Sequence, residues 1–353
     1  PPPPPPPPPF QAEDGIRDTS RGLVGSEMCI RDRTNYLQQK GWLAADDAIK
    51  RVQKPGEGNM NLVLRVVPDS GGSFVIKQAR PWVEKFPHIK APVERIDVEY
   101  QYYRHVNRQL SLSRYSPEIL YYDQENGILA MEDLGNAMDF SFIYRKGKQL
   151  ESSYLEKAID YLNRLKNIPA PANYPLNLAL RKLNHQHIFQ LPFEQNTFEL
   201  DQIQPGLQQL AEKCKQDYSL IEKIQKLGQV YLGSDQYMLH GDFYPGSLLK
   251  SQDGDLKVID PEFSFAGPEE WDIAIFTAHL FLSQMPEMQI RTQLKQYQSN
   301  ADFDQHRFWA FVGIEILRRL LGLAQVPVEF SLSEKAQLID KASAWITNYD
   351  PGR

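Results

Sequence analysis

The stretch Tyr237–Asp272, YMLHGDFYPGSLLKSQDGDLKVIDPEFSFAGPEEWD, carries the strongest signal for the fold of the chain. Two short apolar runs, 248–250 and 256–259, flank an Asp-Gly turn at 253–255. Apolar runs on both sides of such a turn are typical of a β-hairpin. Because a hairpin brings its two ends together, we expect Asp242 and Asp260 to face each other at its open end.

Acidic residues at these two ends suit phosphoryl transfer. One carboxylate must accept or orient the proton of the attacking hydroxyl, and another must hold the Mg²⁺ that bridges the phosphates of ATP. Mg²⁺ prefers oxygen ligands and takes only one or two protein carboxylates. In an extended segment Asp260 and Glu262 would share a face, and Pro261 between them stiffens the geometry. A single aspartate beside a strand is more often an ordinary turn residue, so the prediction depends on the whole arrangement.

This arrangement resembles the aminoglycoside phosphotransferase/choline kinase superfamily, whose fold is like that of protein kinases. That superfamily has H-x-D-x-x-x-x-N, a hairpin and then a metal-binding Asp, and Ser247 stands here at the Asn position. HGDFYPGS followed by DPEF is similar to the methylthioribose kinases within the superfamily. The resemblance implies an α+β, two-lobed, protein-kinase-like fold. Residues 34–131 would form a small β-rich N-lobe, and residues 132–353 a larger, mostly helical C-lobe.

The resemblance also implies roles for the residues around the hairpin. Asp242 would be the catalytic base and contact the substrate, with His240 beside it in the catalytic loop. The metal ligands would be Asp260, Glu262 and Ser247. In the superfamily an Asp before an apolar helix braces the catalytic loop, and Asp272 matches it.

Two arginines late in the chain are further candidates for substrate binding. Arg318 and Arg319 lie in EILRRLLGLA, within the apolar segment 308–324. A buried arginine needs a partner, and ordinary salt bridges are the alternative interpretation. Methylthioribose kinases have a twin-arginine segment that reaches the substrate, and this segment resembles it.

The N-terminal half contains the parts of a nucleotide site. Strands are predicted at 62–67 and 73–78, joined by a glycine-containing turn. Lys77 lies on the second strand, where a kinase places its phosphate-binding lysine; a solvated strand lysine is the alternative. Before the first strand a loop would let backbone N–H groups approach a phosphate, through Gly56, Gly58 and Asn59. A turn without a ligand is the alternative for this loop.

A helix is predicted from residue 93 to about residue 110, and a kinase uses a helical glutamate to hold its lysine. We choose Glu99 over Glu94, with a solvated helix glutamate as the alternative. Strands predicted at 117–122 and 127–131 lead into MEDLG at 131–135. In the superfamily this is the hinge where backbone groups meet adenine, which implies nucleotide contacts at Met131, Glu132 and Leu134. A linker without a ligand role is the alternative.

Apolar spacings of three and four residues predict further helices, at 34–52, 150–165, 207–232, 268–282 and 308–324. His185 and His187 form an H-x-H motif, but no Cys or carboxylate set accompanies them at metal-ligand spacing, so we do not interpret them as a metal site. Residues 1–33 are expected to lie outside the fold. Nine prolines there favour a polyproline II rod, and the rest resembles translated adapter sequence, so a disordered or artefactual leader is expected.

Composition narrows the class of protein. The 353 residues are 41% hydrophobic and 24% charged, typical of a globular chain with an ample core. A net charge of −6 without a basic stripe argues against a nucleic-acid partner. Cys29 and Cys214 form no disulfide framework, which favours the cytoplasm. No uninterrupted apolar run is long enough for a membrane span.

The leading hypothesis is an ATP- and Mg²⁺-dependent kinase that transfers the γ-phosphoryl group to a small-molecule hydroxyl. Methylthioribose, or a related sugar, is the most specific acceptor that the resemblance implies, with a role in methionine salvage. The alternatives are a kinase of another small alcohol or an aminoglycoside, and a non-catalytic, kinase-like nucleotide-binding protein, because Ser247 replaces an expected Mg²⁺ ligand. The sequence leaves the oligomeric state open, with a homodimer as one assembly.

Overall fold

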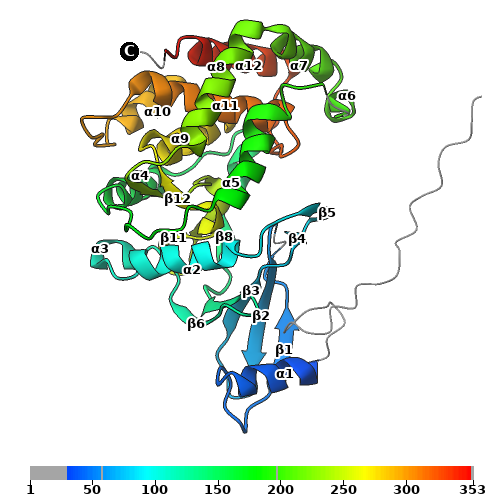
Figure 1. Ribbon diagram of the computed structural model, residues 1–353, viewed down its shortest axis with the longest axis vertical. Helices are drawn as coiled ribbons and strands as arrows, with labels where there is room; N and C mark the ends of the chain where they lie inside the picture. The colour runs from blue at the N-terminus through cyan, green and yellow to red at the C-terminus, as the bar shows by residue number, and fades with distance from the viewer. Residues whose placement is uncertain (1–29, 57–58, 196–197, 351–353) are drawn as a thin grey trace, which may run out of the picture.

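A computed structural model describes residues 30–56, 59–195 and 198–350. These residues form a smaller lobe around a sheet and a larger helical lobe, stacked along the long axis of the molecule (Figure 1). The smaller lobe contains a five-stranded antiparallel sheet in the order β1–β2–β3–β7–β6. Its strands are β1 (Ile49–Gln53), β2 (Leu62–Pro68), β3 (Phe74–Gln78), β6 (Ile119–Asp123) and β7 (Ile128–Glu132).

The predicted strands of the N-terminal half are present because their apolar side chains pack into a core, and the central strands β3 and β7 are almost entirely buried. In β2 every second side chain is buried, as expected of a half-buried strand. Leu37 of α1 (Ile30–Gln39) packs with the buried side chains Ile49, Val66, Phe74 and Ile76. The short hairpin of β4 (Trp82–Val83) and β5 (Phe86–Lys90) and the helix α2 (Arg95–Val106) complete the lobe. Figure 1 shows α2 between the sheet and the larger lobe.

The helix expected over 34–52 is wrong in its second half. Helix α1 ends at Gln39, Gly41 adopts φ +69°, and residues 49–53 form a strand antiparallel to β2. A glycine in this conformation ends a helix at low cost, and the edge of β2 then offers backbone hydrogen bonds that outweigh a local helical pattern. Helix α1 also begins at Ile30, inside the segment that was expected to lie outside the fold; residues 1–29 are outside the described range.

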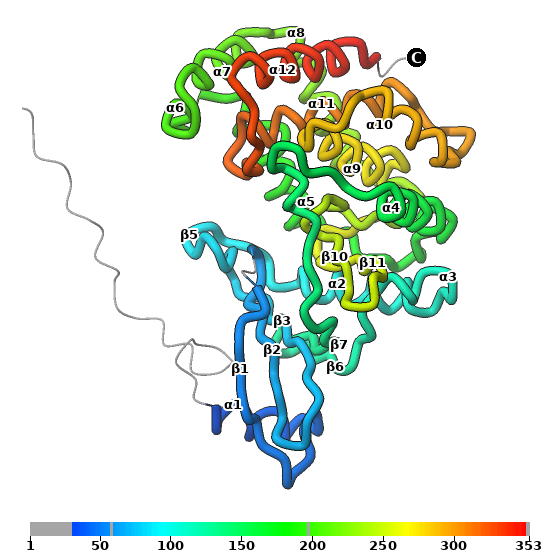
Figure 2. The backbone as a smooth tube through the Cα atoms, turned by 180° about the vertical axis from the view of Figure 1, so that it is seen from behind, coloured from blue at the N-terminus to red at the C-terminus, as the bar shows by residue number. Residues whose placement is uncertain are grey.

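The larger lobe is built around α9 and α11. All residues of α9 are buried, as are those of α11 from Ala310 onward, as expected of apolar helices in a core. Figure 2 shows the helical lobe from the opposite side. Its helices, with α3 beside α4, are α3 (Leu110–Ser113), α4 (Ser152–Leu165), α5 (Leu178–His185), α6 (Leu200–Ile203), α7 (Leu207–Gln216), α8 (Tyr218–Leu232), α9 (Glu270–Leu282), α10 (Glu287–Leu294), α11 (Gln305–Leu321) and α12 (Leu332–Thr347).

Short strands of the larger lobe, on the side that faces the smaller lobe, hold the candidate site (Figure 1). The predicted hairpin is present as β10 (Leu248–Lys250) and β11 (Leu256–Val258), and β8 (Met138–Asp139) pairs with β10. A second pair joins β9 (Tyr237–Leu239) and β12 (Phe265–Gly267). Single turns lie between them: η1 (Ser141–Tyr144), η3 (Pro245–Ser247) and η4 (Pro261–Phe263), with a π-helical turn η2 (Gln186–Gln190) after α5. Across residues 30–56, 59–195 and 198–350, no helix is both long and apolar enough to span a membrane.

Candidate active site

The loop that carries Asp242 follows β9 and is held from behind by α9. Asp272 accepts hydrogen bonds from the backbone N–H groups of His240 at 2.6 Å and Gly241 at 2.9 Å. Burial raises the pKa of Asp272 to about 7, against the lowering effect of these two hydrogen bonds. The bracing contact expected of Asp272 is therefore present, and it fixes the backbone just before Asp242.

His240, predicted as catalytic, lies behind the loop and not in the cavity. Its side chain is fully buried and its Nε2 lies 2.9 Å from the carbonyl oxygen of Ile259. A carbonyl only accepts, so Nε2 carries the proton. Burial lowers the pKa of His240 to about 4, so the ring is neutral near pH 7. The geometry suits a positioning residue that ties the catalytic loop to the end of the hairpin, and not a group that contacts a substrate.

A cavity of about 400 Å³ lies between the lobes, within the size range of ligand pockets. It brings together most of the predicted site residues: Gly56, Asn59, Lys77, Met131, Glu132, Leu134, Asp242, Ser247, Asp260 and Glu262. Of the other predicted residues that the structure describes, Glu99, His240, Arg318 and Arg319 do not line it. Gly58 lies outside the described residues.

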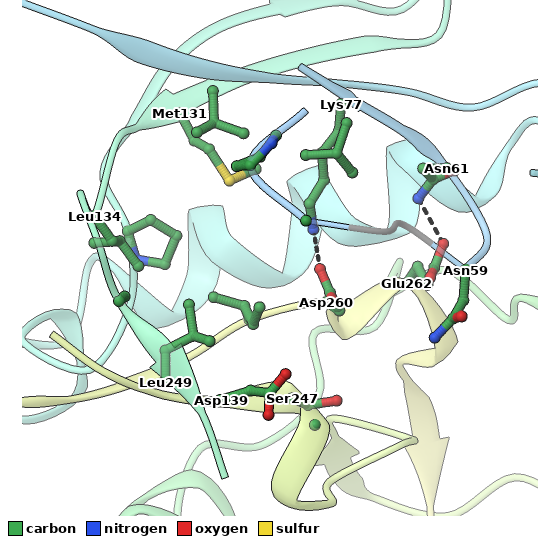
Figure 3. A pocket seen from close by; sticks show the side chains of 18 of the residues that line it. Asn59, Asn61, Lys77, Met131, Leu134, Asp139, Ser247, Leu249, Asp260 and Glu262 are labelled. Carbon is green, nitrogen blue, oxygen red and sulfur yellow. Dashed lines mark hydrogen bonds and ion pairs between the residues drawn. The ribbon is translucent and has the colours of Figure 1, made fainter. Parts of the chain in front are cut away.

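Lys77 joins the two lobes across this cavity (Figure 3). Its Nζ donates to Glu99 Oε1 at 2.6 Å and also to the carboxylate of Asp260. Burial alone would lower the pKa of Lys77, but the carboxylates of Asp260 and Glu99 outweigh it and hold the pKa well above its ordinary value. The lysine is therefore a fixed cation beside Asp260. Glu94, the reserve partner, is exposed at the start of α2.

Asp260 and Glu262 do not share a face, because the DPE segment is not extended. Asp260 adopts the left-handed conformation at φ +63°, and residues 261–263 form a single helical turn. Figure 3 shows the result: Asp260 points to Lys77, whereas Glu262 points to Asn61. Asn61 Nδ2 donates to Glu262 Oε2 at 2.7 Å, and Arg95 Nε lies 3.6 Å from the same oxygen.

Arg95 was not predicted from the sequence, although its side chain makes five hydrogen bonds beside Glu262. It is fully buried and donates to the carbonyl oxygens of four residues: Met60, Arg80, Trp82 and Pro92. Its Nε also donates to Asn61 Oδ1 at 2.8 Å. Arg95 thus ties the loop before β2 to α2 and to the DPE turn. Burial, with repulsion from Glu99, raises the pKa of Glu262 to about 8 despite this arginine.

The oxygen atoms at the open end of the hairpin suit a hard cation that also binds phosphates. Over the described ranges, no group of three or more His, Cys, Asp or Glu residues is arranged to hold a metal ion by itself. Asp260 is partly exposed to the cavity, with 42% of its side chain accessible. Ser247 is buried and its hydroxyl donates to the carbonyl oxygen of Asp242 at 2.9 Å. One accessible carboxylate, which also accepts from Lys77, with few supporting oxygens fits Mg²⁺, which keeps water and phosphate ligands.

Asp242 lines the same cavity as this carboxylate and contacts the second of the two late arginines. Arg319 Nη2 is 3.5 Å from Asp242 Oδ1. Burial raises the pKa of Asp242, and Arg319 and Arg318 oppose that rise. Both arginines pair with Glu315 inside α11, so the salt-bridge interpretation holds for Arg318, while Arg319 also reaches the carboxylate of Asp242.

Comparisons with known proteins agree with this geometry. A model of the APH phosphotransferase enzyme family matches residues 52–309. The chain is 27% identical to the methylthioribose kinase of Escherichia coli O45:K1 over 256 residues, which cover 66% of this chain and 58% of that protein. It is 27% identical to the methylthioribose kinase of Geobacillus kaustophilus over 326 residues, 77% of this chain and 78% of that one. The chain thus spans less than two thirds of the length of the first relative.

Two solved structures are similar over nearly the whole chain. LicA in complex with AMP has a TM-score of 0.52 at 15% identity and covers 91% of this chain and 100% of its own. Spectinomycin phosphotransferase APH(9)-Ia, in complex with ADP and spectinomycin, has a TM-score of 0.54 at 11% identity. The similarity covers 91% of this chain and 98% of that one. At these identities the likeness shows the fold alone, and it confirms the expected two-lobed, protein-kinase-like α+β fold.

Proposed function

Because the chain belongs to the APH phosphotransferase enzyme family, we propose that it is an ATP- and Mg²⁺-dependent kinase of a small-molecule hydroxyl, with methylthioribose as the first acceptor to test. One observation carries the proposal. Lys77, held by Glu99, contacts Asp260 in the same cavity that Asp242 lines from the other lobe. A candidate phosphate-binding cation, a candidate metal ligand and a candidate base thereby line one cavity, as phosphoryl transfer requires.

The nucleotide would lie along the smaller lobe. Met131 and Leu134 line one end of the cavity, at the segment expected to meet adenine, and Lys77 lies further in (Figure 3). The backbone at Gly56 and Asn59 borders the same cavity, where N–H groups can approach phosphate oxygens. Lys77 would exchange its contact with Asp260 for contacts to phosphate oxygens, while Glu99 keeps its ammonium group in place.

Asp260 would hold Mg²⁺, with Glu262 and Ser247 as further oxygen donors. When bound, Mg²⁺ would neutralise the charge that develops on the β- and γ-phosphates. Glu262 is already bound by Asn61 and lies beside Arg95, so its contribution requires that it turn away from Asn61 or bind through its other oxygen.

Asp242 would orient the acceptor hydroxyl and take its proton. A general base works best when its pKa lies near the working pH, and burial raises the pKa of Asp242 in that direction. Asp272 holds the backbone on the N-terminal side of Asp242, through His240 and Gly241. The carboxylate is therefore presented from a fixed loop, which favours productive alignment.

The experiment is a measurement of Mg²⁺-ATP-dependent phosphorylation by the purified chain, with methylthioribose, choline, an aminoglycoside and simple pentoses as acceptors. Asp242→Asn keeps the shape of the side chain and removes the base, so turnover should fall by about 10² to 10⁴-fold while ATP binding remains. Asp253→Asn is the matched control, because Asp253 is exposed in the turn of the same hairpin, and it should leave turnover unchanged.

Turnover of methylthioribose that is lost in Asp242→Asn would support the proposal in full. Turnover of another acceptor alone would support the proposed kinase activity and contradict methylthioribose as the acceptor. ATP binding without turnover of any acceptor would contradict the kinase and favour the non-catalytic, nucleotide-binding alternative.

A further inference from the structure

We propose that Glu315 is a positioning residue for phosphoryl transfer, which holds Arg319 at a set distance from Asp242 so that the carboxylate stays available to the acceptor hydroxyl. This inference rests on the proposed function. It concerns a residue of the EILRRLLGLA segment to which the sequence motifs and the family resemblance assign no role, within α11 and outside the cavity between the lobes.

Glu315 is fully buried and binds three donors from two helices. Arg318 Nη1 lies 3.0 Å from its Oε2, and Arg319 Nε lies 2.5 Å from its Oε1. His279 Nε2 of α9 lies 3.1 Å from Oε1. A buried carboxylate is stable only when it is paired and hydrogen-bonded, and these donors hold the pKa of Glu315 well below its ordinary value despite burial.

His279 fixes the orientation of this carboxylate from behind. Burial lowers the pKa of His279 to about 4, so the ring is neutral near pH 7. Its Nδ1 lies 2.6 Å from the hydroxyl of Tyr144 in η1. Because a carboxylate only accepts, Nε2 carries the proton and donates to Glu315, and Nδ1 accepts from Tyr144. Tyr144, His279 and Glu315 therefore form a chain of two hydrogen bonds, in which Tyr144 donates to His279 and His279 donates to Glu315.

Arg319 is held by the protein on several sides. Its Nε donates to Glu315, its Nη1 donates to the carbonyl oxygen of Ala324 at 3.2 Å, and its guanidinium lies 5.1 Å from the ring centre of Tyr244. Only Nη2 faces Asp242, at 3.5 Å, which is long for a charge-assisted hydrogen bond. This geometry gives Asp242 a nearby positive charge without occupying its oxygens in a tight ion pair.

The charges balance only when Glu315 is present. Two arginines, Arg318 and Arg319, face two carboxylates, Glu315 and Asp242. Without the charge of Glu315, Arg319 keeps a single carboxylate partner and is free to close on Asp242 in a bidentate pair, which is the preferred arginine–carboxylate geometry. The acceptor hydroxyl would then compete with Arg319 for the same oxygens.

The experiment compares Glu315→Gln with the wild-type chain in acceptor phosphorylation. The glutamine keeps the volume and one acceptor oxygen, and removes the charge. We expect kcat to fall by about tenfold to hundredfold, with the KM for ATP changed by less than about twofold, because Lys77 and the hinge are untouched. Glu315→Asp keeps the charge and should retain much of the wild-type kcat. If the glutamine variant does not fold, the kcat of Glu315→Asp is compared with that of the wild type instead.

The matched control is Glu270→Gln. Glu270 is another fully buried glutamate paired with an arginine of α11, Arg307, at 2.8 and 2.9 Å. It should lower stability without a selective loss of kcat. Equal effects on kcat in the two variants would reduce Glu315 to a structural residue and overturn the inference.

A double-mutant cycle separates this inference from the proposed function. The coupling between Asp242→Asn and Arg319→Gln in the free energy of unfolding requires no turnover, and it should grow when Glu315 is changed to Gln. An unchanged or smaller coupling would overturn the inference even if the chain phosphorylates no acceptor. A wild-type chain that shows the larger coupling but no turnover would contradict only the proposed function.

Discussion

Replacing Gly241 with alanine should destabilise the fold and displace Asp242. Gly241 adopts φ +89°, a conformation that side-chain-bearing residues rarely take. An added Cβ would lie 2.1 Å from the carbonyl oxygen and 2.5 Å from the carbonyl carbon of Phe263. Both atoms belong to the backbone of the DPEF segment, so no side chain can rotate away to relieve the contact.

The loop cannot easily move aside, because both backbone polar groups of Gly241 are hydrogen-bonded to side chains. Its N–H donates to Asp272 at 2.9 Å, and its carbonyl oxygen accepts from Trp271 Nε1 at 3.0 Å. The left-handed conformation costs about 1–2 kcal/mol for a residue with a Cβ, and overpacking costs about 1–3 kcal/mol more. We therefore expect a loss of about 2–5 kcal/mol in the free energy of unfolding.

Gly71→Ala isolates the conformational part of this cost. Gly71 lies between β2 and β3 at φ +94°, and an added Cβ would meet no atom within 4 Å. Urea unfolding of both variants should give a larger loss for Gly241→Ala, and the difference measures the contact with Phe263. A shift of Asp242 by a fraction of an ångström should also lower kcat by about tenfold or more in Gly241→Ala alone.

Equal losses of stability in the two alanine variants, together with unchanged kcat in Gly241→Ala, would refute the reasoning. That result would mean that the catalytic loop and the DPEF segment are not packed backbone to backbone.

Three further predictions test other contacts of the site. Lys77→Met should lower kcat/KM by at least about 10²-fold, measured in the acceptor assay; retained activity would contradict its phosphate role. Arg95→Met should raise the KM for ATP and cost about 3–5 kcal/mol in urea unfolding, because Asn61 and four backbone carbonyl groups lose a buried donor; a cost below about 1 kcal/mol would contradict the importance of these hydrogen bonds. The pKa of His279 is lowered from 6.5 to about 4, so its contribution to stability is complete above pH 6.5 and is lost as the pH falls toward 4. Between pH 7 and 5 the wild type should therefore lose stability relative to His279→Gln by about 1.4 kcal/mol per pH unit below 6.5, whereas parallel curves would contradict the buried neutral ring.

The elements that sequence patterns predicted correctly are those defined by local signals. The hairpin of β10 and β11 follows from an Asp-Gly turn between apolar runs, and the strand that carries Lys77 follows from a run of strand-favouring apolar residues after a glycine-containing turn. Strand β1 was mistaken for helix because its backbone partners in β2 lie 12 to 19 residues further along the chain, beyond the reach of a local helical pattern.

The parts of the site that were missed depend on contacts between distant segments. Arg95 and Asn61 meet Glu262 across more than 150 residues of chain. No local pattern marks them, although an arginine at the start of a largely buried helix was a signal that a buried partner exists. The shared face expected for Asp260 and Glu262 failed because Asp260 is in the left-handed conformation. The predicted roles of the nucleotide- and metal-binding residues stay predictions, although their positions around one cavity agree with them.

The most direct measurement of the central claim is phosphorus NMR of a reaction that contains the purified chain, Mg²⁺-ATP and methylthioribose. The account predicts a new phosphate-ester signal that grows in equal amount with ADP and is absent with Asp242→Asn. Hydrolysis of ATP to inorganic phosphate without an ester, or an ester that forms equally well in Asp242→Asn, would contradict it.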